Sequence, residues 1–299
     1  MENNFDVIII GGSYAGLSAG MSLGRSLRNV LMIDSGKPCN RQTPYSHNFL
    51  THDGRTPEEI STIAKAQVQK YNTVKFHDEV VVKTAKNSDG FEVETISGKK
   101  FYAEKLVLAS GVRDVMPNIQ GFAECWGISV LHCPYCHGYE VKNTLTGILS
   151  NGDIAFDFSK IVFNLTKDLI LFTNGKSTLN AEQVEKLNKN KIHVIEDEIV
   201  KLEHENGQIQ KIILKNGSEV PLKALYAKIP FEQNVDVENL GLELTDHGFI
   251  KIDSMHKANI HGVFACGDNV TMMRSVANAI AQGNFTGAIV NKELSEERF

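Results

Sequence analysis

The sequence lacks the features that mark a membrane protein or a nucleic-acid-binding protein. The apolar run nearest its start, residues 7–10, is far shorter than the roughly 20 residues that a bilayer span requires. It follows Glu2 and Asp6 rather than a basic leader, which argues against a signal peptide. Lysine and arginine total 31 against 36 acidic residues, a formal net charge of −5, and no stretch gathers the basic residues into a stripe. We therefore expect neither a membrane nor a nucleic acid as a partner.

The chain has few cysteines, and their number is odd. The chain has 299 residues, enough to bury a core without disulfide staples, and its five cysteines are Cys39, Cys125, Cys133, Cys136 and Cys266. This usage predicts a reducing compartment, the cytoplasm, where a close pair of cysteines is explained by redox chemistry or by metal binding. The length and the ordinary share of apolar residues, 42%, favour a globular protein of about two domains.

The first hundred residues predict a βαβ unit followed by a meander. Residues 5–10 have the apolar pattern of a buried parallel strand, residues 15–27 a helix, and residues 29–34 a second strand. A further helix is predicted to start at Pro57, and β-like runs at 80–85, 91–95 and 99–102 predict a meander inserted in this domain. Residues 106–109 again have the continuous apolar pattern of a buried parallel strand.

A second βαβ pattern follows a linker near Pro117 and Gly121. Strands are expected at 145–150 and 168–172 with a helix at 153–165 between them, and a last strand ends before a helix at 274–294. Strands that alternate with helices predict an α/β fold with parallel sheets.

The turn after the first predicted strand fits a dinucleotide. Gly11 and Gly16 supply two of the three positions of the glycine fingerprint, with Ser13 in place of the middle glycine. The unpaired N–H groups and the dipole of a helix N-terminus face the phosphates in such a motif. Asp34, about 20 residues further on, is the acid expected to hold ribose hydroxyls. An ordinary turn is the alternative interpretation.

The segment Cys133-Pro134-Tyr135-Cys136-His137 is the most specific feature of the chain. Its spacing puts two sulfurs within disulfide reach across the first turn of a helix, where the dipole favours a thiolate. A structural zinc site would need two more ligands at similar spacing, and His132 and His137 are too close to complete one. An inert buried pair is the other alternative.

Together, the glycine turn with Asp34, the central Cys-x-x-Cys and the late segment 262–268 resemble the low-molecular-weight thioredoxin reductases over essentially the whole chain. The resemblance implies an α/β fold of two Rossmann-like three-layer domains: a discontinuous FAD domain of residues 1–116 and 243–299 with a β-meander, and an inserted dithiol domain of residues 117–242. It also implies a homodimer. The implied FAD-binding residues are Gly11, Ser13, Gly16, Asp34, Ser35, Arg41, Asn48, Val81, Gly111, Gly267, Asp268 and Val276.

The same resemblance implies roles for these residues. The glycine turn and Asp34 would hold the ADP half of FAD, Asn48 and Val276 would lie near the isoalloxazine, and Asp268 would bond the ribityl chain or the pyrophosphate. Cys136 would exchange electrons with the flavin, and Cys133 would meet the substrate. The substrate would be a small dithiol or a thioredoxin-like protein.

The chain departs from the reductases at two places, the stretch that would bind NADPH and the residue after the second cysteine. The stretch 150–155 has lost the first glycine of the second nucleotide motif, and residues 172–176 offer neither arginines for NADP nor an acid for NAD. Efficient use of NADPH is therefore doubtful. His137 stands where the reductases have Asp and could exchange a proton near neutral pH, with a structural cap as the alternative.

Cys-Pro-aromatic-Cys-His followed by Gly-Tyr-Glu resembles the dithiol oxidases of natural-product pathways, including gliotoxin oxidoreductase. Three hypotheses follow. The first is an FAD-dependent dithiol oxidase, or a reductase with another electron donor, in which Cys133, Cys136 and His137 are catalytic. The second is an NADPH-dependent thioredoxin-disulfide reductase. The third is a flavin-bound redox sensor or interaction module.

Overall fold

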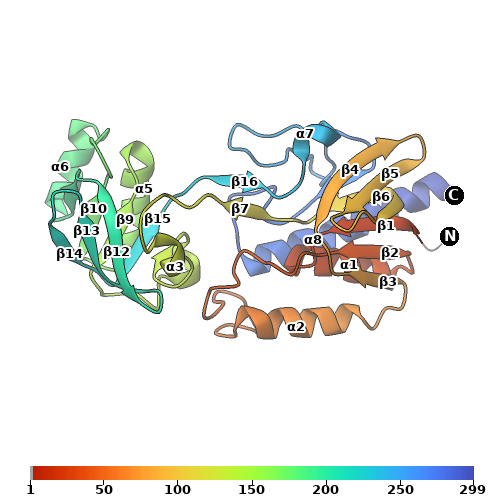
Figure 1. The fold of residues 1–299 in the computed structure, drawn as a ribbon, viewed down its shortest axis with the longest axis horizontal. Helices are drawn as coiled ribbons and strands as arrows, with labels where there is room; N and C mark the ends of the chain where they lie inside the picture. Colours follow the sequence, from red (N-terminus) through yellow and green to blue (C-terminus); the bar gives the residue numbers. More distant parts are fainter. Residues whose placement is uncertain (1–2) are drawn as a thin grey trace. The chain divides into compact units, whose positions relative to one another are not determined.

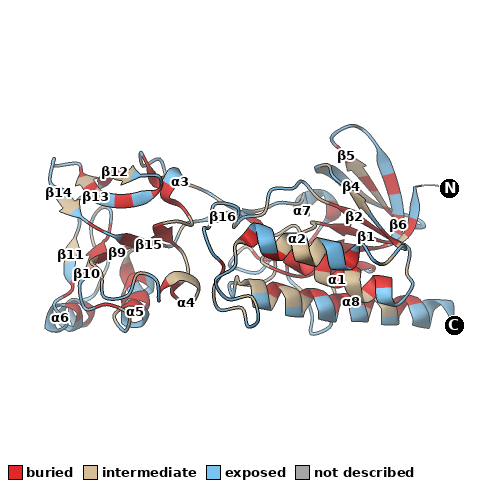
Figure 2. Ribbon diagram, turned by 90° about the horizontal axis from the view of Figure 1, so that it is seen from below, coloured by how far each residue is buried: buried red, intermediate tan, exposed pale blue. Residues whose placement is uncertain are grey.

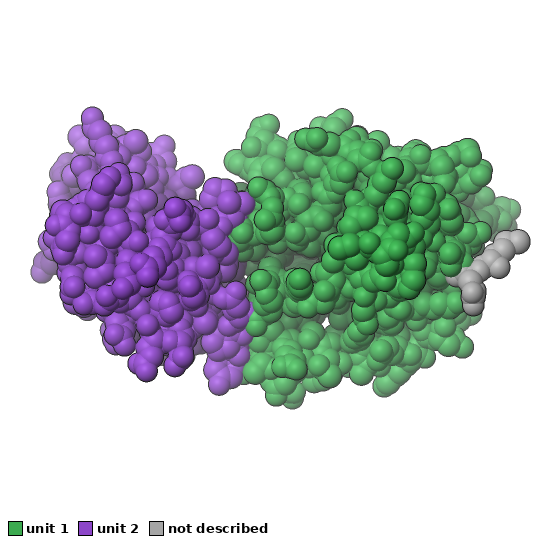
Figure 3. Space-filling model, viewed as in Figure 1, with its two compact units in different colours: residues 1–41, 49–114, 231–299 green, residues 42–48, 115–230 purple. Residues whose placement is uncertain are grey.

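The computed structural model describes residues 3–299, which divide into two compact units (Figure 3). Unit 1 comprises residues 1–41, 49–114 and 231–299, and unit 2 comprises residues 42–48 and 115–230. Among the described residues, no helix is long and apolar enough to cross a membrane.

Unit 1 is built on a seven-stranded sheet in the order β3-β2-β1-β6-β5-β4, with β17 paired to β6 (Figure 1). Strands β1, β2, β3, β6 and β17 run parallel, whereas β4 and β5 form an antiparallel meander on β6. A two-stranded ribbon of β7 and β16 completes the unit. The elements are β1 (Asn4–Ile10), α1 (Tyr14–Arg25), β2 (Val30–Ile33), α2 (Pro57–Val68), β3 (Val74–His77), β4 (Val81–Asn87), β5 (Gly90–Thr95), β6 (Lys100–Leu108), β7 (Val112–Asp114), β16 (Phe231–Gln233), α7 (Val237–Leu240), β17 (Val263–Ala265) and α8 (Val276–Arg298).

The two faces of this sheet bury different partners because side chains alternate along a strand. In β1, Val7 and Ile9 join the core shared with α1 and α8, whereas Ile8 and Ile10 join the core shared with the meander. Buried residues accordingly lie along the strands and on the inner faces of the helices (Figure 2). Unit 1 thus has helices α1 and α8 on one face of its sheet, and on the other face a core to which the meander strands and the segment 235–260 contribute.

Unit 2 contains a second parallel sheet in the order β11-β10-β9-β15-β8 and an antiparallel sheet in the order β12-β13-β14. Helices α5 and α6 pack on one face of the parallel sheet. The antiparallel sheet and α3 pack on the other face. The elements are α3 (Phe122–Cys125), β8 (Val130–Leu131), α4 (Pro134–His137), β9 (Thr146–Leu149), α5 (Gly152–Val162), β10 (Leu169–Phe172), α6 (Ala181–Lys189), β11 (His193–Ile195), β12 (Ile199–Glu205), β13 (Gln208–Leu214), β14 (Glu219–Pro221) and β15 (Ala224–Ala227).

Three boundaries differ from the sequence prediction. The runs 99–102 and 106–109 form the single strand β6, because its first half pairs with β5 and most of its length pairs with β1. Residues 231–242, predicted in the inserted domain, group with unit 1, since β16 pairs with β7 and Leu240 and Leu242 pack in the core of unit 1. Residues 42–48, predicted in the FAD domain, group with unit 2.

Helices α1 and α8 approach each other so closely that glycine is required at the contact. A Cβ atom at Gly283 of α8 would overlap the carbonyl oxygen of Ala15 in α1. The Ser18 hydroxyl donates a 2.7 Å hydrogen bond to the carbonyl of Ile280 across the same contact. This packing fixes α1, and therefore the turn that precedes it.

We predict that Gly283→Ala destabilises the protein although alanine favours helix by about 1 kcal/mol over glycine. The overlap with Ala15 should outweigh that gain and give a net loss of about 1–3 kcal/mol, as overpacking does elsewhere. Urea unfolding of the purified protein measures it, with Ala288→Ser on the exposed side of α8 as the control. An unchanged or raised midpoint for Gly283→Ala would contradict the packing argument.

Candidate functional site

The turn from β1 to α1 forms a backbone cradle at the edge of the unit 1 sheet. A Cβ at Gly11, which has a φ of +106°, would overlap the carbonyl of Ala109, and a Cβ at Gly16 would overlap the carbonyl of Gly11. Ser13 is the N-cap of α1, makes no side-chain cap hydrogen bond, and is followed by a first turn without acidic residues. The helix N-terminus is thus shaped and charged for an anion such as a phosphate.

Asp34 ties this cradle to the neighbouring strand. Its Oδ1 accepts a 2.9 Å hydrogen bond from the Gly12 N–H, and its Oδ2 accepts one of 3.2 Å from the Gly36 N–H. Asp34 and the exposed Ser35 follow β2 directly. Because β1 and β2 are parallel, their carboxyl ends meet at one edge, where an acid can reach the ribose of a nucleotide held at the turn.

The carboxyl ends of β6 and β17 extend the same edge. Gly111 follows β6 with a φ of +62°, and Gly267 follows β17 with a φ of +90° and donates a 2.7 Å hydrogen bond to Gln282. Burial raises the pKa of Asp268, whereas Arg274, whose Nε lies 3.5 Å from Oδ2 of Asp268, lowers it.

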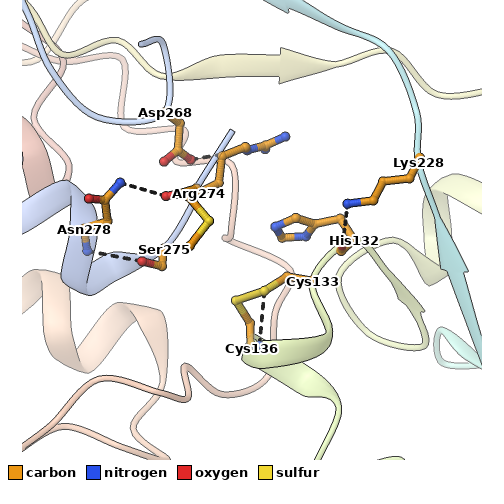
Figure 4. The surroundings of a disulfide bond; sticks show 9 residues. His132, Cys133, Cys136, Lys228, Asp268, Arg274, Ser275 and Asn278 are labelled. Carbon is orange, nitrogen blue, oxygen red and sulfur yellow. Dashed lines mark hydrogen bonds and ion pairs between the residues drawn. A yellow bond between two sulfur atoms is a disulfide. The ribbon is translucent and has the colours of Figure 1, made fainter. Parts of the chain in front are cut away.

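Arg274 also joins the loop after β17 to β7. Its guanidinium donates two hydrogen bonds, of 2.7 and 3.1 Å, to the carboxylate of Asp114. Figure 4 shows Arg274 beside Asp268, with Ser275 capping α8 by accepting from the N–H of Asn278. Val276 is the first residue of that helix, so its position is fixed by the cap.

The remaining predicted cofactor residues are placed differently. Arg41 is exposed and donates to the carbonyl of Pro38 at 3.2 Å. Val81 is the first residue of β4 and packs against the core between sheet and meander. Asn48, with a φ of +58°, belongs to the segment that groups with unit 2. Most predicted FAD residues therefore gather in unit 1 at the carboxyl ends of parallel strands, and Asn48 does not.

The dithiol motif of unit 2 forms a disulfide across a one-turn helix. Cys133 is the N-cap of α4, and Pro134 occupies the first helical position. Cys133 and Cys136 are joined, with their Cα atoms 5.4 Å apart, and the Cys136 N–H donates a 3.2 Å hydrogen bond to Cys133 Sγ (Figure 4). Gly138 ends the helix, where a Cβ would overlap the carbonyl of Pro134.

His137 lies in a cluster of ionisable side chains. Burial lowers its pKa, the Glu140 carboxylate opposes this shift, and His47 adds to it. The Nε2 of His47 lies 3.6 Å from Oε1 of Glu140, and the ring of His132 lies with its centroid 6.5 Å from that of His137. A neutral imidazole at neutral pH is suited to accept a proton. The sequence motif contained Glu140 but gave it no role, because only the fold brings His47 to it.

The turn from β9 to α5 has the topology of a second nucleotide site, but a side chain fills it. Asn151 Oδ1 accepts hydrogen bonds from the N–H of Gly152 at 2.8 Å and of Thr178 at 2.9 Å, and its Nδ2 donates to the carbonyl of Lys176. Asp153 adds a negative charge to the first turn of α5, where a phosphate would bind.

The residues after β10 are also engaged internally. Thr173 Oγ1 donates to the carbonyl of Gly175 at 2.7 Å, and Asn174 Oδ1 accepts from the Ile199 N–H at 2.7 Å. This is the position at which a dinucleotide site carries an acid or an arginine for the ribose. In the second βαβ unit these side chains therefore take part in hydrogen bonds within the unit.

Comparison with known proteins identifies the family. The sequence pattern of the pyridine nucleotide-disulphide oxidoreductases matches residues 5–283. The chain belongs to this family. Thioredoxin reductase tcpT of Claviceps purpurea is 32% identical over 305 residues, which cover 98% of this chain and 95% of the relative.

Two solved structures are similar over almost the whole chain. A Bacillus anthracis protein described as the thioredoxin reductase TrxB has a TM-score of 0.94 at 32% identity and covers 99% of this chain and 100% of its own. An oxidoreductase from Agrobacterium tumefaciens has a TM-score of 0.92 at 34% identity, covering 98% and 99%. The predicted resemblance to thioredoxin reductases and the α/β fold are thereby confirmed.

The family assignment gives the general type of reaction and the cofactor. The protein is an oxidoreductase that acts on sulfur groups, in a family that binds FAD. The cradle of Gly11 and Gly16, the open N-terminus of α1 and the placement of Asp34 fit the pyrophosphate and ribose of that cofactor.

We predict the thiol count of the protein from its cysteine environments. Unfolded without reductant, it should expose three thiols, those of Cys39, Cys125 and Cys266, and after reduction five. In the folded protein Cys125 and Cys266 should react slowly, because burial raises their pKa to about 11 and about 12. Titration with a chromogenic disulfide reagent measures both quantities, and five thiols without reductant would contradict the disulfide.

Proposed function

We propose that this protein is an FAD-dependent dithiol/disulfide oxidoreductase whose Cys133–Cys136 pair exchanges electrons with the flavin without efficient use of NADPH. The observation that carries the proposal is a disulfide at the start of α4, next to the largely buried His137. Its motif resembles that of the gliotoxin-type dithiol oxidases. FAD bound in unit 1 would supply the two-electron acceptor, or the donor if the reaction runs in reverse.

The sulfur–sulfur bonds that break and form balance between the substrate dithiol and the cysteine pair. One substrate thiolate attacks Cys133 Sγ, which breaks the disulfide and releases Cys136 as a thiolate. The second substrate thiolate then displaces Cys133, so that the substrate leaves as a disulfide and the enzyme pair holds two electrons. The Cys136 N–H, 3.2 Å from Cys133 Sγ, stabilises a thiolate there, and His137 accepts a proton from an incoming thiol.

The second nucleotide site argues for a partner other than NADPH. Asn151 occupies the turn at which a pyrophosphate would approach, and Asp153 repels it. The enzyme that the dithiol has reduced would then be reoxidised by oxygen or another acceptor, and in the reducing direction another donor would reduce it. A thioredoxin-disulfide reductase driven by NADPH is the second candidate, which the names of the relatives support.

The partners in this proposal follow the resemblance to the family. The substrate is a small dithiol or a thioredoxin-like protein, and the protein acts as a homodimer in the cytoplasm. Tyr135 and Tyr139, both exposed beside the disulfide, offer aromatic surface to either substrate.

We predict that anaerobic dithiothreitol bleaches the flavin absorption band and that NADPH and NADH leave it unchanged. Stopped-flow spectra of the purified protein measure this, with an NADPH-driven thioredoxin reductase as the positive control. Rapid bleaching by NADPH would favour the second candidate.

We further predict that Cys133→Ser and Cys136→Ser each abolish multiple turnover of a dithiol. Both remove the exchange pair while leaving the cradle of unit 1 intact, so flavin content should be retained. Cys125→Ser, a buried cysteine of the same unit outside the pair, is the matched control. Turnover that survives in either motif variant would refute the proposed chemistry.

A further inference from the structure

Two buried carboxylates of unit 1 share one guanidinium. Arg274, in the loop before α8, donates hydrogen bonds of 2.7 and 3.1 Å to the two oxygens of Asp114, the last residue of β7. Its Nε lies 3.5 Å from Oδ2 of Asp268 and has no hydrogen-bond partner among residues 3–299 (Figure 4). The side chains of Arg274, Asp114 and Asp268 are 14%, 8% and 18% exposed. Two carboxylates against one guanidinium leave one negative charge without a counter-ion in a site largely shielded from water.

The backbone around Arg274 is fixed by the start of α8. Ser275 Oγ accepts a 3.2 Å hydrogen bond from the Asn278 N–H, and Asn278 Nδ2 donates one of 2.8 Å to the carbonyl of Met273. These two bonds hold the residues on either side of Arg274. The side chain of Arg274 therefore leaves the loop from a fixed point, and its planar guanidinium can match both oxygens of Asp114 at the same time.

Asp268 lies among groups that act on its charge in opposite directions. The ionisable groups that face it are Arg274, Asp114 and the thiol of Cys39, which donates a 3.8 Å hydrogen bond to Oδ2 of Asp268. Burial raises the pKa of Asp268, Arg274 lowers it, and Asp114 raises it. Without the guanidinium, burial and the second carboxylate would act in the same direction and favour a protonated acid. The charge of Asp268 therefore depends on Arg274.

We propose that Arg274 is a positioning residue of the cofactor site, which holds Asp114 through two hydrogen bonds and keeps the neighbouring Asp268 ionised for FAD. The inference rests on the part of the proposed function that places FAD in unit 1, and it does not depend on the dithiol chemistry. A carboxylate accepts hydrogen bonds and repels phosphate, so an ionised Asp268 suits the hydroxyls of the ribityl chain rather than the pyrophosphate. A protonated Asp268 would offer fewer acceptor sites to these hydroxyls.

The test measures the FAD affinity of the apoprotein as a function of pH. At about pH 6, Arg274→Gln should bind FAD about tenfold more weakly than the unaltered protein, and it should regain affinity as the pH rises, because only ionised Asp268 is competent. The unaltered protein should show no such rise over the same range. Calorimetry in buffers of different ionisation enthalpy should count about one proton released for each FAD that Arg274→Gln binds near neutral pH.

Three further variants separate the charge of Arg274 from its contribution to structure. Arg274→Lys keeps the charge and should keep the affinity independent of pH. Asp114→Asn combined with Arg274→Gln removes the second carboxylate, so affinity should recover at a lower pH than in Arg274→Gln alone. The affinity of this double variant should still depend on pH, so it replaces the single variant if that one does not fold. Arg113→Gln removes the exposed ion pair with Glu232 on the same ribbon of β7 and β16 and is the matched control, which should change nothing.

The possible failures are distinguishable. An equal loss of affinity at every pH in Arg274→Gln, or recovery of the double variant at the same pH, would give Arg274 a structural role only and overturn the inference. Ser13→Glu, which places a carboxylate at the N-terminus of α1, tests the placement of FAD itself and should weaken its binding about tenfold. Unchanged affinity in Ser13→Glu would contradict FAD binding in unit 1, and the inference would fail with it. If dithiothreitol does not bleach the flavin, the dithiol chemistry fails and the inference on Arg274 stands.

Discussion

The site of unit 1 depends on close backbone contacts that only glycine allows, because a Cβ atom at these positions would overlap a neighbouring carbonyl. Gly11 lies against Ala109, Gly16 against Gly11, and Gly283 against Ala15. These approaches lock β1, β6, α1 and α8 into one arrangement and aim the N-terminus of α1 along the edge where parallel strands end. An anion-binding helix terminus is useful only when held in this way, because its field falls off within the first turn.

The two βαβ units of the chain differ at the turns where a nucleotide phosphate would bind. In unit 1, the turn before α1 carries a serine without a cap hydrogen bond and no acid in the first turn. In unit 2, the N-cap Asn151 accepts a hydrogen bond from the Gly152 N–H, and Asp153 adds a negative charge to the first turn of α5. The two turns therefore differ in the charge of the first helical turn and in the side chain at the N-cap, while in both a glycine N–H of the turn is bound by a side-chain oxygen.

The Cys133–Cys136 pair lies among groups that affect the charge of its sulfurs and of His137. Cys133 caps α4 and receives the N–H of Cys136, which favours a thiolate on the sulfur that would meet the substrate. Burial lowers the pKa of His137, and the Glu140 carboxylate opposes that shift. The two cysteines, His137 and Glu140 thus lie within eight consecutive residues, and His47 joins Glu140 from a separate segment.

The sequence by itself determined the α/β class, the glycine turn with Asp34 and the redox spacing of Cys133 and Cys136, because each follows from local spacing or from strand and helix periodicity. It also indicated the loss of the second nucleotide motif. The tertiary structure alone decided that β6 is one continuous strand, that residues 231–242 pack with unit 1, and that His47 meets Glu140. These features join residues far apart along the chain, and their contacts depend on packing that no local pattern of residues encodes.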